Sequence, residues 1–215
     1  GVYPPNGRVR VAAPLRVNDE AVRLAVIARL GWIKRQQVKF IKQEREAQHE
    51  YVNGESHYFL GNRYLLNVIE NSPSGKVSIR NKKRLDLFVR AGSGRAQRER
   101  IMLNWYREYL RQVVPLLIEK WECILGVQVA DWGVKQMKTK WGACNIQKKR
   151  IWINLELAKK TEACLEYIIV HEMMHLLERH HNERFLALMN RFMPRWETHR
   201  AELNRAPLGH VDWEY

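Results

Sequence analysis

Apolar residues recur every three or four positions in three parts of the chain, and this period predicts helices. The longest such part runs from residue 95 to residue 125. A shorter amphipathic run over residues 182–194 predicts another helix. Between these two, a further helix is predicted around apolar positions that share one face: Leu165, Ile169, Met173 and Leu176.

Shorter apolar and aromatic runs follow the longest predicted helix and predict strands. They lie at residues 128–132, 137–144 and 150–155, and the last two read as a hairpin with a polar turn near residues 147–149. One long helix, three strands and two shorter helices in this order predict an α+β fold. We expect the helices to pack on a small, mostly antiparallel sheet.

The first 92 residues contain less predicted helix and more turns. Residues 9–12 predict a strand, and a helical stretch follows from residue 18 to about residue 48, interrupted near Gly31. Hairpin turns are predicted at Asn53-Gly54 and Gly61-Asn62. This part is therefore predicted to be β-rich with a helical insert.

Small, flexible residues separate this part from the long helix. The run Ala91-Gly92-Ser93-Gly94 is the strongest boundary signal in the sequence. It predicts two domains, a β-rich region at residues 1–92 and a second domain at residues 95–215. A similar run at residues 72–75 is predicted to precede a further pair of strands.

The composition is that of a folded protein without a membrane span. The chain has 215 residues and eight tryptophans, enough to build a sizeable core. Its three cysteines, Cys123, Cys144 and Cys164, are widely spaced, which argues against a disulfide framework or a cysteine zinc finger. No apolar run is long enough to cross a bilayer, and we expect a cytoplasmic protein. Gly1 in place of methionine suggests a trimmed start.

Positive charge is concentrated in two segments. Residues 76–100 hold nine Lys and Arg against two acids, and residues 133–150 hold six against none, within a net charge of +14. Such segments attract phosphate backbones, and they are equally typical of a solvated surface. The candidate nucleic-acid contacts are Lys82, Lys83, Arg84, Lys138 and Lys140.

The most informative residues are His171, Glu172 and His175, the three defined positions of a His-Glu-x-x-His motif. On a helix the two histidines lie one turn apart on the same face, where two imidazoles can reach one metal ion. A catalytic zinc site needs a third protein ligand and keeps a position for water. His181 is the candidate, ten residues after His171 as in metzincin proteases, and it requires the helix to end near Leu177.

This pattern predicts one Zn²⁺ per chain and a peptide-hydrolysing reaction. Three neutral imidazoles leave most of the charge of the zinc available to lower the pKa of a bound water. Glu172 would accept the proton of that water and deliver it to the leaving amine. An oxyanion donor could come from His180, Tyr167 or His199, and the acceptors that orient the histidines from Glu178 or Glu197; the sequence does not choose among them.

Two strings before the motif add a family resemblance. Residues 138–144 read Lys-Thr-Lys-Trp-Gly-Ala-Cys, and residues 150–155 read Arg-Ile-Trp-Ile-Asn-Leu. Together with His171, His175, His181 and the Phe four residues after His181, they resemble the YgjP-like metallopeptidases from about Val9 to Asn204. Lys140 and Ala143 replace the Arg and Ser of the family pattern. More distantly, the site is similar to those of WLM and SprT-like proteases.

The resemblance implies a zincin-type core, zinc-dependent peptide hydrolysis and a peptide or protein substrate. It also implies activity near nucleic acid, and a possible setting beside type I restriction–modification genes. Zincins bind an extended peptide along a strand edge beside the metal, so Trp141, Gly142 and Ala143 are the candidate substrate-binding residues.

Two other classes of function stay open at this point. One is a nucleic-acid-associated binding module with a structural or vestigial zinc site, although such a module has no need of Glu172. The other is a zinc hydrolase of non-peptide substrates such as a nucleobase deaminase, which would carry His-x-Glu together with Pro-Cys-x-x-Cys, and no Pro-Cys-x-x-Cys occurs here.

Overall fold

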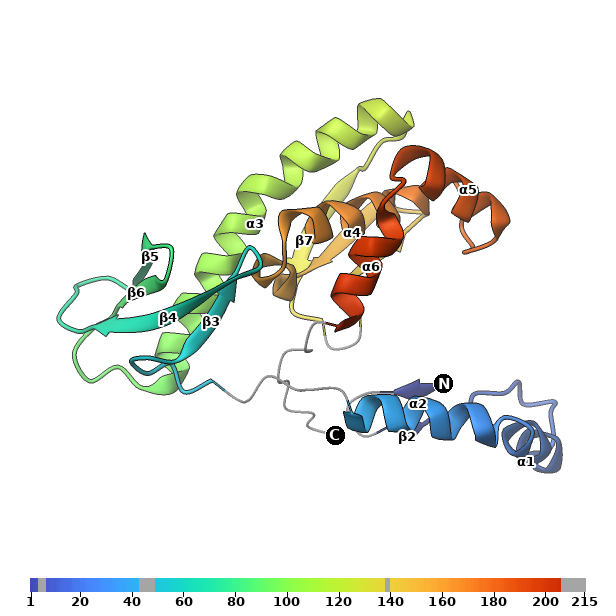
Figure 1. The fold of residues 1–215 in the computed structure, drawn as a ribbon. Coiled ribbons are helices and arrows are strands. Elements are labelled where there is room, and N and C mark those ends of the chain that lie inside the picture. Colours follow the sequence, from blue (N-terminus) through green and yellow to red (C-terminus); the bar gives the residue numbers. More distant parts are fainter. Residues whose placement is uncertain (4–6, 43–48, 138–139, 206–215) are drawn as a thin grey trace. The chain divides into compact units, whose positions relative to one another are not determined.

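The computed structural model describes residues 1–3, 7–42, 49–137 and 140–205 (Figure 1). The chain divides into two compact units, one of residues 1–46 with residues 207–215 and one of residues 47–206. In the described part of the chain, no helix is long and apolar enough to cross a membrane.

The first unit contains a two-stranded antiparallel sheet and two helices. Their bounds are β1 (Val2–Tyr3), β2 (Arg8–Val9), α1 (Asp19–Ile27) and α2 (Leu30–Lys42). Asn18 caps α1, because its side-chain oxygen accepts a hydrogen bond from the Ala21 N–H at 2.8 Å. The predicted strand at 9–12 is thus shorter and earlier, and the predicted helical stretch breaks at residues 28–29. Its last part, residues 43–48, lies outside the described residues.

The second unit begins with a mixed four-stranded sheet. Its strands are β3 (Ser56–Phe59), β4 (Asn62–Ile69), β5 (Lys76–Asn81) and β6 (Arg84–Phe88), in the order β3-β4-β6-β5 with β4 parallel to β6. The β3–β4 hairpin turns at Leu60 and Gly61, whose φ values of 51° and 77° suit a tight two-residue loop. This turn lies one residue before the predicted one. Asn53-Gly54 forms a turn that precedes β3 and does not join two strands.

A single helix of 31 residues, α3 (Arg95–Leu125), follows this sheet with the predicted bounds. Every third or fourth residue of α3 is buried from Met102 to Leu125, so one face of the helix belongs to the core. The predicted boundary residues 91–94 lie between β6 and α3, inside the second unit. Two domains divided at this segment stay a prediction.

The rest of the second unit carries a three-stranded sheet and three helices. They are β7 (Asp131–Lys135), β8 (Gly142–Asn145), β9 (Arg150–Asn154), the 3₁₀ helix η1 (Leu155–Lys159), α4 (Glu162–Met174), α5 (Glu183–Phe192) and α6 (Trp196–Arg205). The strand order is β7-β9-β8, and β8 pairs antiparallel with β9 as predicted. Because β7 runs parallel to β9, the sheet is mixed and not mostly antiparallel. Helix α6 was not predicted from the sequence.

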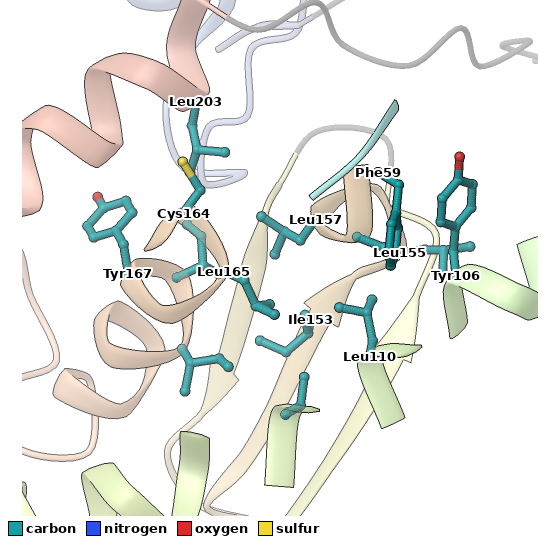
Figure 2. Close-up of a cluster of buried hydrophobic side chains, with 14 of the residues drawn as sticks. Phe59, Tyr106, Leu110, Ile153, Leu155, Leu157, Cys164, Leu165, Tyr167 and Leu203 are labelled. Atoms are coloured by element: carbon teal, nitrogen blue, oxygen red, sulfur yellow. The ribbon is translucent and has the colours of Figure 1, made fainter. Parts of the chain in front are cut away.

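One hydrophobic core joins these elements. Figure 2 shows Ile153 of β9 and Leu155 and Leu157 of η1 between Leu110 of α3 and Leu165 of α4. All five side chains are at most 1% exposed. The central strand β9 and the segment after it therefore lie between the long helix and the helix that carries the histidine motif.

Candidate metal centre and its cleft

The histidine motif occupies the C-terminal end of α4. Thr161 caps the start of this helix, and nine residues between Cys164 and Met174 are buried. The helix ends at Met174 with His175 as its C-cap, three residues before the predicted end at Leu177. Tight hydrogen bonds from the N–H groups of Leu176 and Leu177 to Met173 and Met174 turn the chain there. His181 therefore lies in the loop between α4 and α5.

This loop returns His181 to the two helical histidines. The Nε2 atoms of His181 and His171 lie 2.9 Å apart, and one ligand atom from each of the three rings lies within 4.8 Å of the others. Zinc–nitrogen bonds of about 2.0–2.1 Å in a tetrahedron place two ligand nitrogens about 3.3 Å apart. The distance between the His171 and His181 nitrogens thus lies within a few tenths of an ångström of what a shared zinc ion requires.

The imidazoles are held by packing and by one backbone acceptor. His175 Nδ1 lies 3.2 Å from the Glu178 carbonyl oxygen, which can only accept, so Nδ1 carries the proton and Nε2 keeps its lone pair. Phe185 of α5 is 1% exposed and contacts all three rings, with centroid distances of 5.1, 5.0 and 4.7 Å. Phe185 therefore fixes the relative placement of the three histidines.

The local environment keeps the rings of His171 and His175 neutral, as metal binding requires. Burial, followed by the neighbouring rings of His175 and His181, lowers the pKa of His171 to about 3. Burial also lowers the pKa of His175. Three converging imidazole nitrogen donors without a carboxylate among them fit a metal of the zinc class.

Glu172 lies beside the three histidines and is almost completely buried. Its side chain is 7% exposed, and burial raises the pKa of its carboxyl to about 7, against a smaller opposite effect of Lys140. Gly142 makes room for it, because a Cβ at Gly142 would lie 2.7 Å from both Cγ and Oε1 of Glu172. Position 142 of β8 therefore requires glycine, because any larger residue would collide with the Glu172 side chain of α4.

A cleft of about 540 Å³ opens beside these groups. It is lined by the three histidines, Glu172 and the three predicted substrate-binding residues Trp141, Gly142 and Ala143. Since β8 is at the edge of its sheet, one side of its backbone is not used by a neighbouring strand. The cleft is also lined by residues that were not candidate site residues from the sequence: Cys144, Ile146, Ile168, Arg179, Arg200, Leu203 and Asn204.

Asn154 holds the segment that enters the cleft. Its side-chain amide donates to the carbonyls of Met137 and Lys140 at 2.8 and 2.7 Å, and its Oδ1 accepts from the N–H groups of Met137 and Glu156. Asn154 is 3% exposed, at the end of the central strand β9. The sequence of residues 150–155 contains this asparagine but does not by itself show which groups it would hydrogen-bond.

The predicted accessory residues differ in their places. Tyr167 lines the cleft, with its ring 5.8 Å from that of His171, and burial raises the pKa of its hydroxyl so that it stays a donor. His180 is exposed, and His199 packs 6.5 Å from the Tyr167 ring; neither lines the cleft. Glu178 reaches His175 through its backbone carbonyl and not through its carboxylate, whereas Glu197 is exposed.

The candidate nucleic-acid contacts do not form one group. Lys82, Lys83 and Arg84 are exposed at the turn between β5 and β6, in the four-stranded sheet. Lys140 lines the cleft beside β8, and Lys138 lies outside the described residues. Binding of nucleic acid by these residues stays a prediction.

A second group of metal-ligand residue types lies near β3. His49, Glu55 and His57 also bring one ligand atom each within 4.8 Å of the others. Here the Glu55 carboxylate accepts from His49 Nδ1 at 3.0 Å, from His57 Nε2 at 3.1 Å and from the N–H groups of Glu50 and Tyr51. Four donors already occupy this carboxylate, so the arrangement is a closed hydrogen-bond cluster.

Comparison with known protein families identifies one match. The model of the YgjP-like metallopeptidase domain matches residues 1–206. No curated protein matches the chain. The match spans the cleft, the three histidines and Glu172, together with nearly all of the remaining chain. This protein therefore belongs to the YgjP-like family of metallopeptidase domains.

Proposed function

We propose that this chain is a zinc-dependent peptidase in which His171, His175 and His181 hold one Zn²⁺ and Glu172 is the catalytic base. The observation that carries the proposal is the convergence of three imidazole nitrogens beside a buried carboxylate at one cleft. A structural metal site has no use for such a carboxylate, and metallopeptidase membership gives peptide bonds as the substrate class.

The bound zinc would supply Lewis acidity and a lowered pKa for a water molecule in the cleft. Glu172 then accepts the proton of the attacking water and passes it to the leaving amine. Its buried position, packed against Gly142, limits the access of bulk water that would compete for that proton. Tyr167 is the donor that we assign to the developing oxyanion, because it alone of the three predicted donors lines the cleft.

The substrate would lie extended along β8. Gly142 and Ala143 are on the edge strand and line the cleft, so their backbone groups can pair with a peptide as an added strand. Trp141, half-buried in the cleft wall, would pack against the side chains of that peptide. Ala143→Trp should raise KM or abolish turnover without unfolding the protein, and normal kinetics in this variant would exclude β8 as the substrate edge.

The test combines metal analysis with digestion of an unbiased peptide library. The native chain should bind one zinc and cleave, whereas Glu172→Gln should keep its zinc and lose most cleavage, since the change removes a base and not a ligand. Unchanged hydrolysis in Glu172→Gln would reject the mechanism. Zinc binding without cleavage by the native chain would instead favour the binding module with a structural zinc site.

A further inference from the structure

The cleft carries more positive charge than its catalytic role requires. Three basic side chains line it from three different segments: Lys140 just before β8, Arg179 after α4, and Arg200 on α6. Glu172 is the one carboxylate among the described lining residues, and it is nearly dry while the three cations are exposed. Charges of one sign around a concave site focus the field onto whatever enters it.

These three cations are also left without carboxylate partners in the described structure. Some basic residues elsewhere in the second unit have carboxylate partners: Lys120 lies 2.7 Å from Glu166, Lys159 lies 2.8 Å from Glu156, and Arg150 pairs with Asp131. Within the described ranges, no carboxylate oxygen lies within ion-pair distance of Lys140, Arg179 or Arg200. Their charge is therefore available to a ligand.

Arg200 is the best placed of the three. Its guanidinium lies 5.8 Å from the centroid of the buried Trp196 ring, which supports the side chain on one side. A guanidinium can bind a carboxylate through two parallel N–H···O bonds, a geometry that an ammonium does not offer.

We propose that this cleft selects peptides that carry a carboxylate close to the scissile bond, with Arg200 as its principal ligand and Lys140 and Arg179 in support. This inference rests on the proposed peptidase function and names its substrate class. A carboxylate can be an Asp or Glu side chain or the C-terminus of the peptide, and the two sources present the same chemistry to Arg200. An extended peptide along β8 carries its side chains toward the cleft walls, which makes either source reachable.

The experiment uses matched fluorogenic peptides that differ only at the positions flanking the cleaved bond. One peptide carries Asp and Glu, a second Asn and Gln, and a third Lys, each with a free or an amidated C-terminus. The acidic peptide should have a kcat/KM about tenfold or more above that of its amide isostere, the scale of one charge-assisted hydrogen-bonded contact. An advantage that depends on the free C-terminus assigns the carboxylate to the peptide end, and one that survives amidation assigns it to a side chain.

Variants separate the role of Arg200 from a general charge effect. Arg200→Gln should remove most of the preference, Arg200→Lys should keep part of it, and Arg200→Glu should favour the Lys peptide. Arg100→Glu, the same change on an exposed residue of α3 outside the cleft lining, should leave the preference intact. The inference would be overturned if the native chain cleaved the three peptides at equal rates. It would also be overturned if Arg200→Glu left the preference unchanged.

A binding measurement keeps this test apart from that of the proposed function. Fluorescence anisotropy of the labelled acidic and amide peptides on Glu172→Gln reports selection without turnover. Tighter binding of the acidic peptide supports the inference even if no peptide is cut, in which case only the peptidase proposal fails. Equal binding refutes the inference, as does a single-stranded oligonucleotide that displaces the acidic peptide and binds more tightly, because phosphate would then be the preferred ligand.

Discussion

Two groups of histidines in this molecule contain the same residue types but are arranged differently. In the first, His171, His175 and His181 turn ring nitrogens toward one another beside an open cleft. In the second, a carboxylate lies between His49 and His57 and accepts hydrogen bonds from both rings and from two backbone N–H groups. The first group has lone pairs to offer, and the second has already used its carboxylate.

The difference shows that nearness of ligand atoms does not by itself make a metal site. Both groups satisfy the same 4.8 Å limit. An ionised carboxylate offers about four lone-pair sites, and Glu55 receives four donors. To bind a metal there, the protein would first have to give up hydrogen bonds that hold the turn before β3. We therefore expect the first group to bind zinc and the second to stabilise the fold.

The largest expected effect is on zinc affinity in the first group. Structural zinc sites contribute about 10–16 kcal/mol, so loss of one of three protein ligands should cost several kcal/mol. His181→Ala should weaken zinc binding by about 1,000-fold, measured by competition with a chelator of known affinity. His180→Ala is the matched control and should bind zinc normally. The reverse result would assign the third ligand to His180.

In the second group, removal of the carboxylate should act on stability and not on zinc. Glu55→Ala leaves two rings and two backbone N–H groups without their acceptor, one of the rings being the 2% exposed His57. The free energy of unfolding should fall by about 3 kcal/mol, as for other disrupted buried networks, in a denaturant titration. The zinc content should stay at that of the native chain. A loss of zinc together with stability would show that this group takes part in metal binding.

Acid should weaken the second group through His57. Burial, followed by the charge of His49, lowers the pKa of His57 to about 4 in the folded chain, from 6.5. Between these two pKa values the unfolded chain therefore binds one more proton than the folded chain. The contribution of His57 to the free energy of unfolding is complete above pH 6.5 and is lost as the pH falls toward 4. The slope contributed by His57 should be about 1.4 kcal/mol per pH unit. In the zinc-free protein, His57→Gln should reduce the measured slope by that amount; equal slopes in both proteins would contradict this account.

The smallest effect should come from the ring that packs against all three histidines of the first group. Phe185→Leu keeps an apolar side chain but removes the flat surface that the imidazoles contact. Zinc affinity should fall about tenfold, the lower range for residues that orient metal ligands. Phe192→Leu, on the same helix but half-buried and away from the histidine rings, should leave zinc affinity unchanged. Equal affinity in both variants would leave Phe185 with a packing role only.

The regular parts of the fold were predictable because they repeat a period. The bounds of α3 follow from its apolar spacing, and the motif on α4 needs only the 3.6-residue turn to bring His171 and His175 together. The return of His181 was predicted from its spacing, although the helix ends at Met174 and not at Leu177. That earlier end depends on tight turn hydrogen bonds of Leu176 and Leu177, which leave no periodic trace in a sequence.

The residues that escaped prediction depend on contacts between distant segments. Arg200 reaches the cleft only because α6 packs on α4, and α6 was not predicted at all. The second histidine group is local, yet it forms through positive φ values at Tyr51 and Gly54 that fold residues 49–57 back on themselves. Tyr51 carries no signal for such a conformation, which is rare outside glycine, asparagine and aspartate.

The amide of Asn154 has a consequence for how the molecule comes apart. It joins the end of the central strand to Met137 and Lys140 on one side and to the start of η1 on the other. Opening of β9 thus releases the wall of the cleft in the same event. The wall stays attached as long as the strand stays paired. Amides of β9 and of the 140–145 wall then exchange with solvent as one cooperative unit, so catalytic competence and local folding are lost together.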